Sequence, residues 1–349
     1  MNRIFFEAAL LSGLFASVAT SHASTLRIHC GDDGDGAEVS INGVFKGECP
    51  LDVQVPAGEL KIRARLAQPG GVDRIAERTM RIGDGVVKSL DLELAENVDP
   101  HDRQSLAKLK AVDAKLGDTS LSKFDLADLL LQKASLLHQL GRYDAALPVL
   151  KQVGALDPRF EPSGMLSWNA LARLQRTEAL PYAEANLNQD VTKPYAHFSV
   201  GMAQYLAGNP DRASSAFDTA ARSPDRVAYA TLWLWLTARR LGDDPNVAVA
   251  PFEAAVKASP WPWTLLQALE GRIDRATAVA ATQIDGHADR ERECELYFYL
   301  GEKAFLQHDD AAARADLQRS IDSHVYNFNE YVSALNEMQR LKQVAGFRD

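Results

Sequence analysis

The pattern of apolar and polar positions changes its period near residue 97. In the first part, runs such as "ELKIRARL", residues 59–66, place an apolar residue at every second position, which is typical of strands with one buried face. From about residue 99, apolar residues recur every three to four positions almost to the end, which predicts helices. We therefore expect a small all-β antiparallel sandwich over residues 24–96, a linker and capping helix over 97–121, and an all-α array over 122–349.

Turn residues divide the first part into hairpins. Asn42-Gly43 lies between "AEVSI" and "VFKGE", and both central residues of a type I′ turn need positive φ, so a tight hairpin is predicted there. A second hairpin is expected about Asp84-Gly85, within "ERTMRIGDGVVKSLDLEL". These turns predict about seven strands at most in a sandwich of this size.

Two of the three cysteines lie in the β region. Strand parity places Cys30 on one face with Leu26 and Ile28, and Cys49 on the face that carries the apolar residues of "LDVQV". Both sulfurs should then point into the core, so we predict a Cys30–Cys49 disulfide, which would stabilise the domain by roughly 3 kcal/mol. Cys294 is left unpaired and is expected to be a small buried residue.

The stretch "VSINGVFKGECPLDVQVPAGELKIRA" resembles the PEGA family. It has a strand, an Asn-Gly turn, a Gly-x-x-Pro-Leu step and a Pro-x-Gly turn, although the turn that names the family reads Pro56-Ala57-Gly58-Glu59 here. The resemblance covers about 60 residues and implies an envelope or surface module without catalysis.

The acidic turn "GDDGDG" is a candidate metal site, because alternating acids and glycines can wrap calcium. Its carboxylates are Asp32, Asp33 and Asp35, and calcium wants six to eight oxygens with a closing bidentate Glu. No full twelve-residue loop follows, so an ordinary acidic turn is favoured over calcium, and no cofactor is expected.

The N-terminus predicts export. After Arg3 an apolar run ends in small residues, which indicates a signal peptide over residues 1–23. The run is interrupted by Glu7 and is too short for a spanning helix, and no Cys follows it to carry a lipid. We expect a periplasmic or secreted protein with no transmembrane segment.

The helical part repeats itself. In "DLLLQKASLLHQLGRYDAALPVLKQVGALDP", Ala134 and Ala146 are small where two helices would meet, Gly141 falls in the turn between them, and Pro158 ends the second helix. These are the offsets of a tetratricopeptide repeat, which predicts a solenoid of stacked helical hairpins. Clear copies are expected over 127–160, 194–227, 228–261 and 294–327.

A second resemblance covers most of residues 120–340. The segments "SVGMAQYLAGNPDRA", "LWLWLTA", "WPWTLLQALEGRID" and "CELYFYLGEKAFLQHDD" occur in the order and spacing of the NlpI-type envelope lipoproteins. That family implies a periplasmic adaptor for cell-wall hydrolases, their processing protease and wall-synthesis complexes. Besides such partners, a homodimer is a further candidate assembly. This chain lacks the lipidated Cys and adds the β domain.

Nothing in the sequence predicts catalysis. It contains no His-Glu-x-x-His, Gly-x-Ser-x-Gly or Walker motif, and its eight His are scattered. The net charge of −9, without basic runs, argues against nucleic acid as a partner.

We therefore expect protein partners in a concave groove lined by the first helix of each hairpin. About half of the groove positions are expected to pack against neighbouring hairpins instead, because periodic apolar residues usually belong to the core. The alternative is a carbohydrate- or surface-binding β module with the array as a spacer or dimerisation platform. The groove positions by register are Asp128, Leu131, Ser135, His138, Tyr195, Phe198, Met202, Tyr205, Tyr229, Leu232, Arg239 and Arg240.

Overall fold

The chain divides into two compact units, Met1–Asp99 and Pro100–Asp349. The computed structural model describes residues 23–31, 33–66, 73–96, 102–157, 162–189 and 193–345. The predicted signal peptide lies outside these residues apart from Ala23, as does Asp32 of the acidic turn.

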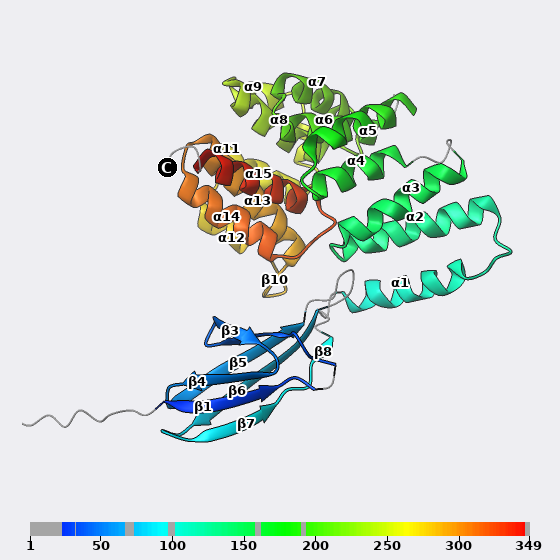
Figure 1. The fold of residues 1–349 in the computed structure, drawn as a ribbon. Coiled ribbons are helices and arrows are strands. Elements are labelled where there is room, and N and C mark those ends of the chain that lie inside the picture. The colour runs from blue at the N-terminus through cyan, green and yellow to red at the C-terminus, as the bar shows by residue number, and fades with distance from the viewer. Residues whose placement is uncertain are drawn as a thin grey trace, which may run out of the picture. The chain divides into compact units, whose positions relative to one another are not determined.

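The described part of the first unit contains eight strands in two sheets (Figure 1). One sheet has the order β4-β1-β7 and the other the order β3-β2-β5-β6-β8. The strands are β1 (Ser24–His29), β2 (Glu38–Ile41), β3 (Val44–Glu48), β4 (Leu51–Val55), β5 (Gly58–Leu66), β6 (Arg74–Ile82), β7 (Val87–Asp91) and β8 (Ala95–Glu96).

The unit is all-β, but it is not purely antiparallel as predicted. β1 pairs antiparallel with β4 and parallel with β7. The turn at Asp84-Gly85 carries the chain from one sheet to the other and closes no hairpin, so that prediction was wrong. The reason is that β7 pairs over five residues, Thr25–His29, with the edge of β1 opposite β4, and local turn chemistry does not encode this long-range pairing.

The core of this unit follows the predicted parity. Leu26, Ile28 and Cys30 are buried, while the residues between them are exposed. The Cys30–Cys49 disulfide is present, with its Cα atoms 6.0 Å apart, and both cysteines lie within the core. At the first hairpin, Asn42 has a φ of 52° and Gly43 a φ of 79°, as the two-residue turn requires.

The acidic turn is tied to the sheet by an arginine. The guanidinium of Arg74 lies 2.7 Å from Oδ2 of Asp33 and donates to Oδ1 over 3.1 Å. This contact holds the pKa of Asp33 below its usual value, chiefly through the hydrogen bond from Arg74. The carboxylate of Asp33 is therefore paired with Arg74 in this structure.

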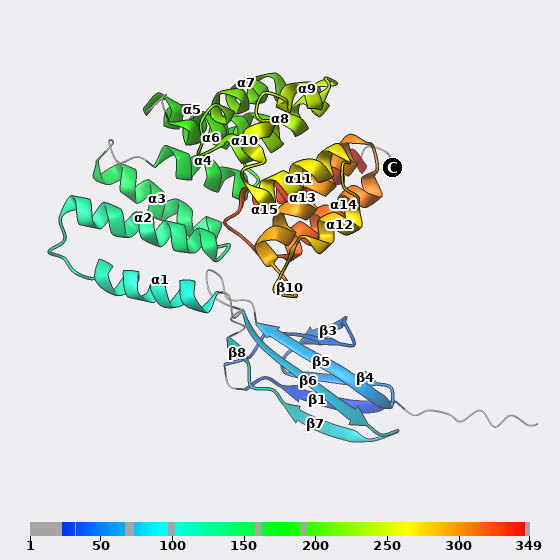
Figure 2. The same ribbon diagram turned by 180° about the vertical axis from the view of Figure 1, so that it is seen from behind.

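The described part of the second unit is helical apart from turns and a two-strand hairpin of β9 (Gln283–Ile284) and β10 (His287–Ala288). Figure 2 shows α10, α11 and α12 leading toward this hairpin. The helices are α1 (Arg103–Leu116), α2 (Lys123–Gln139), α3 (Tyr143–Leu156), α4 (Ser163–Ala172), α5 (Arg176–Gln189), α6 (Pro194–Leu206), α7 (Pro210–Ala221), α8 (Val227–Leu241), α9 (Pro245–Val249), α10 (Glu253–Val256), α11 (Pro260–Glu270), α12 (Arg275–Ala280), α13 (Arg290–Leu306), α14 (Asp310–Asp322) and α15 (Asn329–Ala345).

Consecutive helices pack as hairpins of the tetratricopeptide type. In α6–α7, a Cβ added to Gly201 would lie 2.6 Å from the ring of Phe217, so only glycine permits this approach. In α13–α14, Gly301 meets Leu317 in the same way, at 2.8 Å. Each pair is separated by sixteen residues, so the two hairpins solve one packing problem with one spacing.

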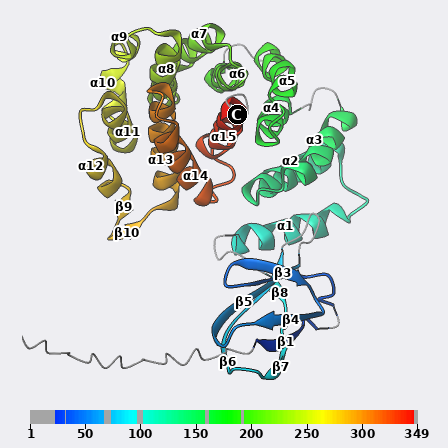
Figure 3. The same ribbon diagram turned by 60° about the vertical axis from the view of Figure 1, so that its left-hand side comes forward.

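The last helix closes the array on itself. α15 packs not only on α13 and α14, which precede it, but also on α4 and α6. Figure 3 shows α15 in the middle of these helices. Every residue of α15 from Asn329 to Leu341 is buried or half-buried. The open groove expected between the first helices of the hairpins is therefore filled by the chain itself in this part of the array.

Candidate functional site

The candidate site is the inner face of the array, meaning the residues of α4, α5, α6, α8 and α13 that contact α15. Four glutamates meet across the packing of α13 on α15. Glu295 and Glu302 lie seven residues apart on α13, and Glu330 and Glu337 lie seven apart on α15, so each pair occupies one side of its helix two turns apart. All four are at most 6% exposed. Buried carboxyl groups require strong compensation, which the two ends of the interface supply differently.

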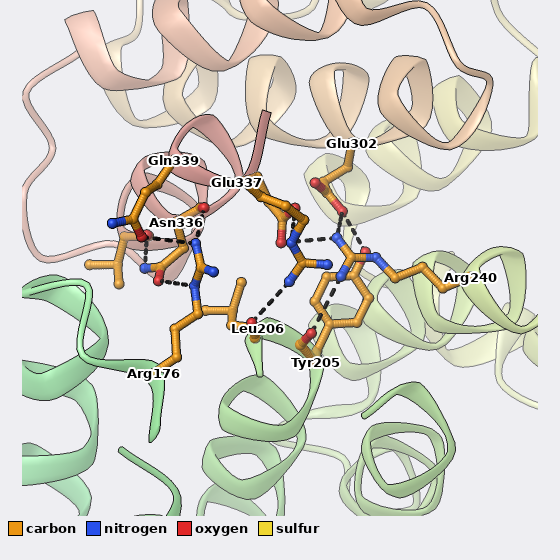
Figure 4. A network of polar contacts seen from close by, with 10 residues as sticks. Arg176, Tyr205, Leu206, Arg240, Glu302, Asn336, Glu337 and Gln339 are labelled. Atoms are coloured by element: carbon orange, nitrogen blue, oxygen red, sulfur yellow. Dashed lines mark hydrogen bonds and ion pairs between the residues drawn. The ribbon is translucent and has the colours of Figure 1, made fainter. Parts of the chain in front are cut away.

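At one end, arginines neutralise the carboxylates, as Figure 4 shows. We call Tyr205, Arg240, Glu302, Glu337 and Arg340 the arginine layer. Nη2 of Arg240 lies 2.9 Å from Glu302 and 2.9 Å from Glu337, so one guanidinium bridges α13 and α15. Its central carbon lies 3.7 Å from the ring centroid of Tyr205, whose hydroxyl donates to Glu302. Arg340 lies 3.4 Å from Glu337.

At the other end, neutral donors replace the arginines. We call Tyr229, Trp261, Glu295, Tyr299 and Glu330 the hydroxyl layer. The hydroxyl of Tyr229 donates to Glu295 over 2.9 Å, and the indole of Trp261 donates to its other oxygen. The hydroxyl of Tyr299 donates to Glu330 over 2.9 Å. Among the described residues, no ion pair joins either carboxyl to a basic side chain.

The pKa values follow from this arrangement. Burial, together with the nearby Glu330, raises the pKa of Glu295 to about 8. Burial also raises the pKa of Glu330. In the arginine layer, burial and the facing Glu337 raise the pKa of Glu302 to about 7, although Arg240 opposes the shift. Glu295 is therefore protonated at neutral pH. This fits the hydroxyl layer, in which no described basic side chain is paired with either carboxyl group.

Further contacts fix α15 along its length. Arg176 of α5 donates to Oδ1 of Asn336 over 3.0 Å and to Gln339 over 3.1 Å. Asn336 in turn donates over 2.8 Å to the carbonyl oxygen of Leu171, at the end of α4. Arg340 donates over 2.9 Å to the carbonyl oxygen of Leu206, where α6 ends. Side chains of α15 therefore donate hydrogen bonds to carbonyl oxygens at the C-terminal ends of α4 and α6.

Half of the groove positions predicted from register lie inside the protein, so they cannot contact a partner in this structure. His138, Phe198, Met202, Tyr205 and Leu232 are at most 6% exposed, and the side chain of Arg240 is 8% exposed. The physical reason is the closure of the array, because α15 and the neighbouring first helices cover the side that an open solenoid would leave free. The other positions are exposed or half-buried, and they are Asp128, Leu131, Ser135, Tyr195, Tyr229 and Arg239.

His138 is a core histidine. Its ring lies 4.7 Å from that of Trp168, and its Nε2 is 3.0 Å from Nδ2 of Asn169. Burial lowers the pKa of His138 to about 4, so the ring is neutral at physiological pH and accepts from Asn169. Cys294 is likewise fully buried, and burial raises its pKa to about 12, as expected of an inert thiol.

Two surface cavities lie beside predicted positions. One of about 580 Å³ is bordered by Arg239 of α8, the turn Asp243-Asp244, Glu270 of α11 and Lys303 of α13. A second, of about 370 Å³, lies between α1 and α2 and is bordered by Ser135. The first cavity carries both charges, whereas the charged side chains that line the second are the lysines Lys108 and Lys115.

The described residues contain no cluster of three or more His, Cys, Asp or Glu placed to hold a metal ion. Within the same residues, no helix is long and apolar enough to cross a membrane.

The fold defines a β-sheet unit followed by a tetratricopeptide-like helical array. No family model matches the chain. Among solved structures, a tetratricopeptide repeat protein from Parabacteroides merdae ATCC 43184 is similar with a TM-score of 0.43 and 14% identity, over 68% of this chain and 92% of that one.

Proposed function

We propose that this protein is an exported, non-enzymatic adaptor that binds other proteins of the cell envelope. The observation that carries the proposal is the array itself, because stacked helical hairpins of this type present extended surfaces to protein partners. The Cys30–Cys49 disulfide supports export, since disulfides persist in oxidising compartments. The signal-like N-terminus agrees with it.

The partners we propose are cell-wall hydrolases, their processing protease or wall-synthesis complexes. This part rests on the sequence resemblance to NlpI-type proteins over residues 120–340. In this scheme the PEGA-like β unit positions the protein, while the array binds.

The cavity beside Arg239 is the surface we propose for first contact. Arg239 is exposed and faces a recess that also contains acidic residues and Lys303. A recess that carries both charges suits a polar peptide segment, and Arg is among the residues that interfaces favour.

The experiment is affinity capture from envelope extracts with cross-linking, using the full exported chain as bait. Arg239→Glu is compared with Arg212→Glu, which changes an exposed arginine on α7 away from the cavity. We expect wild type and Arg212→Glu to enrich the same cell-wall proteins, and Arg239→Glu to lose about tenfold. Equal capture by both variants would move the contact elsewhere, and the absence of cell-wall proteins from all three would reject the function.

A further inference from the structure

The polar character of the α15 interface is unusual for a helix at the centre of a domain. Glu330, Ser333, Asn336 and Glu337 are all on α15, and none is more than 4% exposed. Buried charges and amides of this kind contribute more to specificity than to net stability, because their desolvation offsets their attraction. One short segment, residues 323–328, joins α15 to α14.

The inner face is complementary to one kind of helix. Arg176 and Arg240, which come from α5 and α8, both point at α15 and bond its Asn336 and Glu337. The indole of Trp168 on α4 donates to Asn329 over 3.1 Å. Three donors from three helices thus select a helix with carboxylate and amide groups along one side.

The fit of α15 to this face is incomplete. Oγ of Ser333, Oε1 of Glu302 and Nε of Arg240 are buried and have no hydrogen-bond partner among the described residues. Buried polar atoms without partners destabilise the closed form relative to any helix that could bond them. A competing helix therefore has polar groups left to satisfy.

We propose that the inner face is a receptor for an amphipathic helix bearing carboxylate and amide groups, that α15 occupies it in the free protein, and that a partner protein binds by inserting such a helix in its place. This rests on the proposed function, since it names the kind of segment that an adaptor of this type would capture. Displacement of α15 would free Arg240, one of the groove residues predicted from the repeat register, from Glu337, and Arg176 from Asn336.

Hydrogen exchange of the full wild-type chain tests whether α15 opens on its own. At denaturant concentrations below the unfolding transition, we expect the amides of α15 to exchange at least about tenfold faster than those of α6 and α8. This would show a local opening of α15 that leaves α6 and α8 protected. If α15 exchanges only together with α6 and α8, it is an inseparable part of the core and the proposal fails.

Binding of a labelled peptide, which must compete with α15 for the inner face, tests whether that face accepts a separate helix. The peptide copies residues 327–345, and the bait is the full chain carrying Asn336→Ala and Glu337→Ala, which weakens its own α15. We expect this variant to bind the peptide at least about tenfold more tightly than wild type, because the internal competitor is weaker. A peptide carrying the same two substitutions should lose the binding.

Equal binding of both peptides, or no binding by a folded variant, would overturn the proposal, as would a variant that circular dichroism shows to be unfolded. Light scattering could instead show that the double variant forms a dimer by exchanging α15 between two copies. The occupant of the inner face would then be a second copy of this chain, which would also overturn the proposal. None of these results changes capture through the Arg239 cavity, so the proposed function is tested separately.

Discussion

The arginine layer and the hydroxyl layer bury the same chemistry in different ways. Both place a glutamate of α13 against a glutamate of α15, and both are closed to solvent. In the arginine layer, Arg240 bridges the two carboxylates at 2.9 Å. In the hydroxyl layer, the described residues that donate to Glu295 are the hydroxyl of Tyr229 and the indole of Trp261. The first layer is stabilised by countercharge and the second by a retained proton.

Because of this difference, the stability of the α13–α15 interface should depend both on its arginines and on pH. Removing a cation should damage the arginine layer at any pH at which its carboxylates are ionised. Raising the pH should damage the hydroxyl layer, which has no cation to accommodate a second negative charge.

The largest effect is expected from Arg240→Met. The substitution keeps the length of the side chain but leaves Glu302 and Glu337 buried without their shared cation. We expect a loss of about 3–5 kcal/mol in the free energy of unfolding, because breaking a buried pair strands a charge. Chemical denaturation at pH 7.5 measures it.

The matched control is Arg239→Met, the same change one residue earlier at an exposed position. Exposed substitutions of this kind change stability by less than about 0.5 kcal/mol. Equal losses in the two variants would mean that the arginine layer is not held by its cation.

The second prediction concerns pH. The pKa of Glu295 is raised from 4.5 to about 8, so its stabilising contribution is complete below about pH 4.5 and is lost as the pH rises toward 8. Glu302 titrates near 7, so the loss above pH 7 belongs chiefly to the hydroxyl layer. We expect wild type to lose about 1–2 kcal/mol between pH 7 and 9.

Glu295→Gln with Glu330→Gln should flatten this part of the profile, since amides keep the hydrogen bonds and carry no charge. Glu184→Gln, at an exposed position on α5, should retain the wild-type slope. A double variant with the wild-type slope would show that other groups cause the loss.

Much of the fold follows from local patterns in the sequence. The alternation of Leu26, Ile28 and Cys30 was enough to predict their burial and the disulfide. The parallel pairing of β1 with β7 could not be predicted in this way, because the turn at Asp84-Gly85 has the local chemistry of a hairpin. β7 pairs with a strand about 60 residues earlier in the chain, and such a long-range partner is not encoded in the turn between neighbouring strands.

The candidate site was less accessible to sequence reasoning. Repeat register identified Tyr205 and Arg240 as groove positions, but both are buried against each other and Glu302 of α13, which the register does not show. Arg176 and Asn336 are 160 residues apart, and no local pattern connects them. One signal was present: glutamates spaced seven apart on the apolar side of two helices, which is a costly position for a charge unless it is paired.

The smallest expected effect comes from removing one hydroxyl in each layer. Tyr205→Phe removes the hydrogen bond to Glu302, whose carboxylate is paired with the guanidinium of Arg240. Tyr229→Phe removes the hydrogen bond to Glu295, which is protonated at pH 7. Hydrogen bonds to charged groups contribute more than neutral ones, so we expect Tyr205→Phe to cost about 1 kcal/mol more than Tyr229→Phe.

Denaturation of both variants at pH 7 and pH 9 makes this comparison informative. As Glu295 ionises, its bond from Tyr229 becomes charge-assisted, so the cost of Tyr229→Phe should rise with pH while that of Tyr205→Phe changes less. Costs that are equal at both pH values would mean that the two layers hold their carboxyl groups in the same protonation state. The distinction between countercharge and retained proton would then be lost.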